Sequence, residues 1–454
     1  MSWHKHHRLA AFITIVTLLA APFFAWAAMP APQQDWIRTG TGLGVERVRL
    51  AAADFKQTSA DPQSGKLRDV FNQTLWNDLD NAGIFDMVSK SFYPLDVPGQ
   101  PAEVKLDAWG NPPPNASMLA FGNIGVSGED LAVQGWLFDV KNPASPQVLG
   151  KQYREKATEE NARVIAHRFA NEIIFRLGGG ISGVAESKIY FVSDRTGHKE
   201  IWQMDYDGAN QKQLTRLGAI ALSPRVSPDG TRVAFSASTR DGFQLMMYSL
   251  DLGRLVTFPR FGGTNISPAW SPDGTKIAFS SSRNGDPEIY VADSTGANLR
   301  RVTAYRGPDV SPVFNAKTGA QMAWVSGRSG LPQIYIMDAD GANPQPVTDQ
   351  GYAVSPSWSP NGQLLTFAWI RHYGPGAPGA QDIYLMDIAS RRFVQLTHDA
   401  GRNDFPSWSP DGRHIVFQSN RSGTDQIWTM LADGSQQRQL TRSGRNTQPN
   451  WSSK

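Results

Sequence analysis

The chain has 454 residues, of which 40% are hydrophobic, so it is long enough for two domains with buried cores. It contains no cysteine, which excludes disulfides, cysteine zinc sites and thiol nucleophiles. Its formal net charge of +3 does not indicate the basic surface that nucleic-acid binding requires, and we expect no nucleic-acid partner.

The first 27 residues have the pattern of a secretory signal peptide. Lys5 and Arg8 form a basic start, an apolar stretch follows at 9–24, and Ala25-Trp26-Ala27 fits the cleavage site. A membrane anchor is the alternative, although the apolar stretch is shorter than the roughly 20 residues of a spanning helix. We expect cleavage, export to the periplasm and no membrane span. Without Lys5 and Arg8, 42 of the 44 basic residues remain beside 41 acidic ones, so the mature chain would be nearly neutral.

Residues 28–180 predict a mixed α/β domain. A helix at 66–82 places Leu67 and Phe71 on one apolar face at helical spacing. A second helix follows Thr158, which is a good N-cap residue. Strands are expected at 48–55, 85–89, 118–126, 131–140 and 147–156.

A repeat that returns six times dominates the rest of the chain, which we assign to a second domain at 188–454. Each unit opens on a proline, most have a tryptophan two residues later, and several continue into Ser-Pro-Asp-Gly. The opening prolines are 44, 44, 44, 50 and 43 residues apart. A period of forty-odd residues is typical of a four-stranded propeller blade. The prolines are Pro224, Pro268, Pro312, Pro356, Pro406 and Pro449.

Each unit carries four strand signals. The opening strand leads into an apolar run, a turn containing arginine follows, and a third strand carries an aromatic residue. A hairpin turn, often Asp-Gly, then leads to a short fourth strand. The aligned aromatic residues are Trp202, Tyr248, Tyr290, Tyr335, Tyr384 and Trp428.

The arginine of the second turn recurs in every unit. A basic ring that binds a partner is one interpretation, but the same residue at the same turn favours a structural hydrogen bond to a neighbouring carbonyl or Asp. These arginines are Arg195, Arg240, Arg283, Arg328, Arg371 and Arg421.

The two ends of the repeat region each supply part of one blade. The first unit, 188–215, has strands two to four, and residues 449–452 supply the missing opening strand with Trp451. Pairing them would remove two exposed sheet edges. We therefore predict an α/β N-terminal domain followed by an all-β six-bladed β-propeller, closed by pairing of the C-terminal strand with the first blade.

The motifs of common enzymes are absent from the chain. It has no G-x-S-x-G, no H-E-x-x-H and no phosphate-binding glycine loop, so we predict no catalytic residue, no metal and no cofactor. Two Asp-x-Asp-Gly stretches, 205–208 and 338–341, resemble the start of an EF-hand. Arg216 and Asp349 stand where its bidentate Glu belongs, which favours hairpin turns. A propeller lyase, a hydrolase-associated propeller and a ligand-sensing scaffold remain alternative functions.

The turns on the two faces of the predicted ring differ. Turns after strands one and three repeat Pro-Asp-Gly and Asp-Gly, whereas the loops after strands two and four vary in charge and bulk. The fifth unit inserts residues 372–380 on this variable face. Variable loops on a rigid scaffold are typical of a binding surface. Longer solvated loops without a partner are the alternative.

The order of a signal peptide, a small α/β domain and six Ser-Pro-x-Trp-type units closed by Pro-Asn-Trp-Ser resembles the TolB family, the periplasmic component of the Tol-Pal system. The resemblance implies a non-enzymatic protein, a monomer within a larger complex. It would bind a Pal-like peptidoglycan-associated lipoprotein and a TolA-like inner-membrane-anchored protein. That complex would maintain outer-membrane integrity, support invagination during cell division and take part in colicin import.

Carried onto this chain, the resemblance implies two binding surfaces. The Pal-like partner would contact the variable loops through Asn265, Ile266, Arg306, Asp309, Val310, Tyr352, Arg402, Asp404 and Arg445. The TolA-like partner would contact the N-terminal segment through Trp36, Ile37 and Arg38. The stretch 33–44 lacks the Asp-Ser-Gly pattern of the family at this place.

Overall fold

The computed structural model describes residues 46–373, 380–398 and 400–452. All of them belong to one compact unit of the chain, 35–454. The predicted signal peptide and the residues Trp36, Ile37 and Arg38 lie outside the described residues. Within the described part, no helix is long and apolar enough to cross a membrane.

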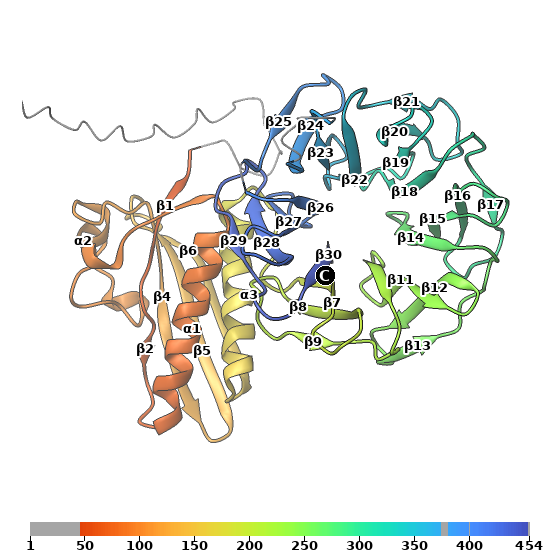
Figure 1. The fold of residues 1–454 in the computed structure, drawn as a ribbon. Coiled ribbons are helices and arrows are strands. Elements are labelled where there is room, and N and C mark those ends of the chain that lie inside the picture. Colours follow the sequence, from red (N-terminus) through yellow and green to blue (C-terminus); the bar gives the residue numbers. More distant parts are fainter. Residues whose placement is uncertain (1–45, 374–379, 399, 453–454) are drawn as a thin grey trace, which may run out of the picture. The chain divides into compact units, whose positions relative to one another are not determined.

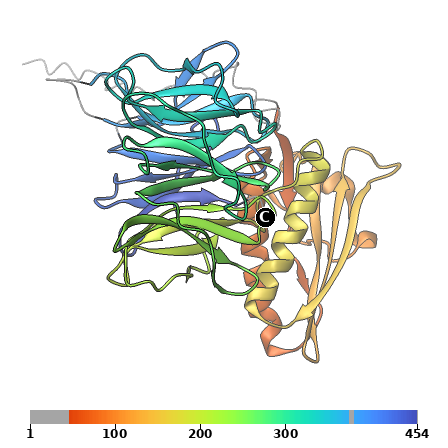
Figure 2. The same cartoon turned by 90° about the vertical axis from the view of Figure 1, so that its right-hand side faces the viewer.

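The N-terminal region forms one mixed sheet with two long helices on the same face (Figure 2). The strand order is β3-β1-β4-β5-β6, with β2 paired to β4; β1 runs parallel to β3 and β4, while β4, β5 and β6 are antiparallel. The strands are β1 Val48–Ala52, β2 Lys56–Gln57, β3 Phe85–Met87, β4 Met118–Ser127, β5 Asp130–Asp139 and β6 Gln147–Lys156. The helices are α1 Pro62–Asn81, α2 Leu106–Gly110 and α3 Glu159–Leu177, with 3-10 turns at Lys90–Phe92 and Pro101–Glu103.

Local sequence explains both long helices. The Asp61 side chain accepts a hydrogen bond from the Gln63 backbone at the start of α1, and Thr158 caps α3 by accepting one from Asn161. The apolar face of α1 includes Phe71, which packs with Phe169 of α3 and the sheet in one buried core. The stretch 94–114, which follows β3, contains α2 and one of the 3-10 turns.

Six four-stranded antiparallel sheets form the propeller ring (Figure 1). Five are continuous in sequence. The first two are β10 Ala221–Val226, β11 Arg232–Thr239, β12 Gly242–Ser249 and β13 Arg254–Val256, then β14 Asn265–Trp270, β15 Lys276–Ser281, β16 Glu288–Asp293 and β17 Arg300–Arg301. The next two are β18 Asp309–Phe314, β19 Gln321–Ser326, β20 Gln333–Asp338 and β21 Gln345–Pro346, then β22 Tyr352–Trp358, β23 Leu364–Ile370, β24 Asp382–Asp387 and β25 Phe393–Gln395. The fifth is β26 Asn403–Trp408, β27 His414–Ser419, β28 Gln426–Leu431 and β29 Arg438–Gln439.

The sixth sheet joins the two ends of the ring, which confirms the predicted closure. It contains β30 Asn446–Trp451 followed by β7 Lys188–Ser193, β8 Glu200–Asp205 and β9 Lys212–Gln213. Trp451 pairs with Ile189, is 5% exposed, and donates its indole N–H to Ser187 Oγ at 2.7 Å. Its site is equivalent to the buried sites of Trp270, Trp358 and Trp408.

Every innermost strand contains a bulge at which one residue has a left-handed backbone conformation. The ladders of β10, β14, β18, β22, β26 and β30 shift register there. The left-handed residues have φ between 51° and 56° and precede the opening prolines; they are Ser223, Ser267, Ser311, Ser355, Phe405 and Gln448. This bend places the residue after each proline on the central channel, where all six line one cavity.

Buried polar contacts join the propeller to α1 and α3. The Tyr206 hydroxyl donates to one oxygen of Asp78, while Nδ1 of His167 lies 2.7 Å from the other. A partly solvent-exposed ion pair between Arg438 and Asp80, at 2.8 Å, adds to these contacts. Because Asp78 is buried, desolvation raises the pKa of its carboxyl.

Candidate functional site

Two faces of the propeller differ in their turns, as the repeat predicts. On the uniform face, the turn after the innermost strand is tied by its own side chains: Ser271 Oγ donates to Asp273 at 2.5 Å, and the Thr275 backbone N–H donates to the same oxygen at 3.0 Å. These bonds lower the pKa of Asp273. Gly274 follows with φ of 69°, which favours glycine. The stretches 205–208 and 338–341 are turns on this face as well.

The residues predicted to bind a Pal-like partner fall into three groups on the opposite, variable face. Arg306, Arg402 and Arg445 are exposed. Ile266, Val310 and Tyr352 are half-buried. Asn265, Asp309 and Asp404 are buried.

The three buried polar residues are bonded within the propeller. Asn265 donates to Gly262 O at 3.0 Å, and Asp309 accepts from Arg328 at 3.0 Å. Asp404 accepts from Ser355 Oγ and from the Phe405 backbone N–H, each at 2.7 Å. Burial is the main cause that raises the pKa of Asp404. These side chains hold the loops and the channel wall, so the exposed residues are the ones able to contact a partner.

The structural interpretation of the repeated arginines is confirmed in three blades. The Arg195 guanidinium lies 4.5 Å from the ring centre of Trp202 and donates to Asn446 Oδ1 at 2.9 Å. Arg421 repeats this with Trp428 at 4.7 Å and Asn403 at 2.9 Å. Arg328 does so with Tyr335 and Asp309. Each of these arginines therefore joins the third strand of its blade to the innermost strand of the same blade. Arg240 is exposed instead.

Tyrosines and arginines gather on the loops of consecutive blades on the variable face. We define the tyrosine–arginine rim as Tyr305, Arg306, Tyr352, Tyr373 and Arg402. Tyr305 and Tyr373 are 53% and 55% exposed, and the rings of Tyr352 and Tyr373 are 5.8 Å apart. Sequence reasoning missed Tyr305 and Tyr373, although each stands beside a basic residue in a variable loop.

The exposed arginines differ in whether an aspartate lies close to the guanidinium. Arg402 lies 3.5 Å from Asp404, and Arg445 lies 2.5 Å from Asp425. Arg306 forms no ion pair with any of the described residues. Arg306 is therefore the rim cation most available to an acidic group on a partner.

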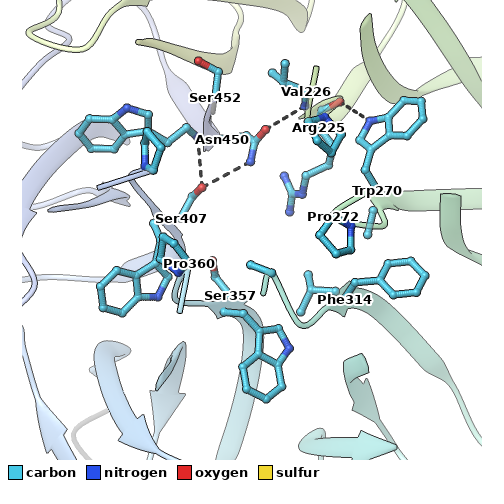
Figure 3. Close-up of a pocket in the computed structure, with 18 of the residues that line it drawn as sticks. Arg225, Val226, Trp270, Pro272, Phe314, Ser357, Pro360, Ser407, Asn450 and Ser452 are labelled. Carbon is cyan, nitrogen blue, oxygen red and sulfur yellow. Dashed lines mark hydrogen bonds between the residues drawn. The ribbon is translucent and has the colours of Figure 1, made fainter. Parts of the chain in front are cut away.

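The central channel has a narrow and a wide part. Near the variable face the free space in the channel is only about 30 Å³. The four serines that precede opening prolines line it, together with Phe405. Toward the uniform face the channel widens to about 380 Å³ (Figure 3). The walls of this wider cavity carry five aromatic residues, Trp270, Phe314, Trp358, Trp408 and Trp451.

Comparison with protein families agrees with both regions of the fold. Residues 41–145 match the model of the TolB amino-terminal domain, and residues 176–372 and 349–454 match that of the TolB beta propeller domain. The two propeller segments together cover more than half of the chain. The chain belongs to the TolB family.

Curated members of the TolB family align with part of the chain. The Protein TolB homolog of Chlorobium chlorochromatii is 40% identical over 200 residues, which span 44% of each chain. The Tol-Pal system protein TolB of Desulfosudis oleivorans is 32% identical over 295 residues, 64% of each chain. The alignments thus span about half to two thirds of the relatives' length.

A solved structure shares the fold over almost the whole chain. The crystal structure of TolB from Acinetobacter baumannii matches with a TM-score of 0.75 at 22% identity. The match covers 91% of this chain and 98% of the other. It supports a six-bladed propeller that follows an α/β region.

Proposed function

We propose that this chain is a periplasmic, non-enzymatic protein-binding component of a Tol-Pal envelope complex. It would link a Pal-like peptidoglycan-associated lipoprotein to a TolA-like inner-membrane-anchored protein. Through these contacts it would maintain outer-membrane integrity, support invagination at cell division and serve colicin import. Its membership of the TolB family supports the Tol-Pal role.

The tyrosine–arginine rim is the single observation that best supports a protein partner. Tyr and Arg are enriched at the energetic centres of protein interfaces because they combine large contact area with hydrogen bonding. The rim stands on a closed ring of sheets, so its loops need little ordering on binding. Asp309 and Asp404, two buried acids of this face, are bonded within the propeller, which is a structural rather than a catalytic use.

The N-terminal segment carries the second half of the proposal. Trp36, Ile37 and Arg38 would contact the TolA-like protein, and the predicted signal peptide would deliver the chain to the periplasm.

Charge reversal on the rim tests the Pal-like contact. We expect Arg306→Glu to weaken binding of the soluble domain of the cognate lipoprotein at least about tenfold, roughly 1.4 kcal/mol, because a desolvated Arg often contributes this much. Adding Tyr305→Ala should weaken it further. Isothermal titration calorimetry on the full mature chain measures both.

The control is Arg254→Glu, on the exposed outer strand β13, which should bind as the wild type does. Equal affinity of wild type and the Arg306→Glu/Tyr305→Ala variant would contradict the assignment of the rim. Failure to recover any peptidoglycan-anchored lipoprotein from periplasm with the wild-type chain would favour a ligand-sensing scaffold instead.

A further inference from the structure

Six equivalent positions surround the channel one residue after the opening prolines. Five of them carry small or neutral side chains, and the sixth carries a guanidinium. They are Arg225, Ala269, Val313, Ser357, Ser407 and Asn450, and all six line the wide cavity. The six positions surround the same part of the channel, and the other five side chains are shorter than arginine. The channel therefore has free space around the Arg225 side chain.

Arg225 has no counter-ion among the described residues. Within the described ranges, its side chain donates one hydrogen bond, from Nη1 to the carbonyl of Pro224 at 2.8 Å. Of the residues that the structure describes, no Asp or Glu lines the cavity. Desolvation lowers the pKa of Arg225 to about 10, so the group still carries its charge at neutral pH. Arg225 is half-buried in the channel wall and its charge is uncompensated there, so an anion that entered the cavity would find a cation with no competing acidic group.

The cavity combines this cation with apolar walls and a few neutral polar groups. Figure 3 shows the Arg225 side chain extending into the cavity between Asn450 and Pro272. Asn450 is held in place, since its Oδ1 accepts from the Val226 backbone N–H at 3.0 Å. A volume of about 380 Å³ lies in the range of pockets that hold small organic molecules or the end of a peptide.

We propose that the wide cavity binds a carboxylate group that is attached to an apolar carrier. The planar guanidinium of Arg225 matches a carboxylate in two parallel hydrogen bonds, and the aromatic walls would receive the carrier. An inorganic oxyanion would find one guanidinium but few further N–H donors. The carrier is either a free small molecule or the C-terminal residue of a polypeptide, which share this chemistry. The site lies on the uniform-face side of the channel, so it is independent of the rim and its proposed partner.

A pair of matched probes tests the charge requirement. N-acetyl-phenylalanine presents a carboxylate on an aromatic carrier, and its amide is the same molecule without the charge. We expect calorimetry on the full mature chain to show saturable binding of the acid, with the amide at least about tenfold weaker. The tripeptide N-acetyl-Gly-Gly-Phe and its amide form the second arm. Tighter binding of the tripeptide acid would indicate a polypeptide end, and equal binding a free small molecule.

Two substitutions test the assignment to Arg225. Arg225→Gln should lose at least about tenfold in affinity for the acid, whereas Arg254→Gln on β13 should not change it. Asn450→Asp keeps the guanidinium and places a carboxylate of the same shape in the neighbouring ring position. It should compete with the probe and abolish its binding while raising the melting temperature.

Several outcomes would overturn the proposal. They are equal binding of acid and amide, full affinity in Arg225→Gln or in Asn450→Asp, and no saturable binding of either acid to the wild type up to about 10 mM. Asn450→Asp decides the matter if Arg225→Gln fails to fold, because it leaves Arg225 in place.

Discussion

At the scale of single residues, the environment of a carboxylate decides its role more than its place in the repeat does. Asp404 is buried beside the channel, and desolvation raises its pKa. Asp273 is in an exposed turn, and hydrogen bonds from Ser271 and Thr275 lower its pKa. Two aspartates of one propeller therefore respond to acid in opposite directions.

The first prediction concerns the pH dependence of stability. The native state binds a proton at Asp404 more tightly than the unfolded chain, whose Asp pKa is about 3.9. The contribution of Asp404 to the unfolding free energy therefore increases as pH falls through the raised native pKa, and levels off below about 3.9. We expect Asp404→Asn to remove this component, which urea unfolding at pH 4 to 7 measures.

Asp273→Asn is the matched comparison. With a lowered native pKa, Asp273 contributes stability above about pH 3.9 that is lost as pH falls through the native value. The substitution should be tolerated, since Asn361 accepts from Ser359 Oγ at 2.6 Å in the equivalent turn. Identical pH profiles for wild type and Asp404→Asn would contradict the assignment.

At the scale of elements, a buried threonine just after the outer strand ties that strand to the third strand in five of the six blades. In the remaining blade, Thr257 after β13 is exposed. Thr397 donates to Asp382 Oδ1 at 2.7 Å and accepts from the Ile383 backbone N–H at 3.0 Å. The same pair of bonds recurs at Thr215, Thr303, Thr348 and Thr441. The repeated Leu-Thr or Val-Thr of the sequence is the mark of this contact.

Removing one threonine hydroxyl should therefore be costly. Thr397→Val keeps the shape but leaves a buried carboxylate and a backbone N–H without this partner, so we expect about 2 to 4 kcal/mol less unfolding free energy. Thr397→Ser retains the hydroxyl and should lose no more than about 1.5 kcal/mol. Urea denaturation measures both. Equal losses in the two variants would mean that the bonds at Thr397 contribute little.

At the scale of the whole molecule, stability depends on joining the two ends of the propeller. The edge of β7 pairs with β30, and Trp451 fills the core between β27 and β7. We predict that deletion of residues 449–454 lowers the melting temperature and broadens the transition, because it exposes a sheet edge and empties the site of a buried aromatic residue. Differential scanning calorimetry measures both effects.

Deleting only the last two residues, 453–454, is the control for this truncation, because it leaves β30 complete. It should melt as the full chain does. An unchanged melt after deletion of 449–454 would show that the ring is stable without the pairing of β30 and β7.

The sequence by itself determined the blades, their number and their closure. Strand and turn preferences act over a few residues, and six repetitions make a weak local signal strong. The helices α1 and α3 were predictable for the same reason, from apolar spacing and from caps such as Thr158.

Only the tertiary structure decided which polar side chains are exposed or unpaired, and so able to bind a partner or ligand. Asn265, Asp309 and Asp404 were expected in the variable loops, yet they lie at the start of innermost strands and are buried there. Arg225 looks like any other basic residue in Ser-Pro-Arg, but its isolation depends on five side chains contributed by the other blades. Burial and charge pairing are set by residues far apart in the chain, because a closed ring brings together groups that no local pattern relates.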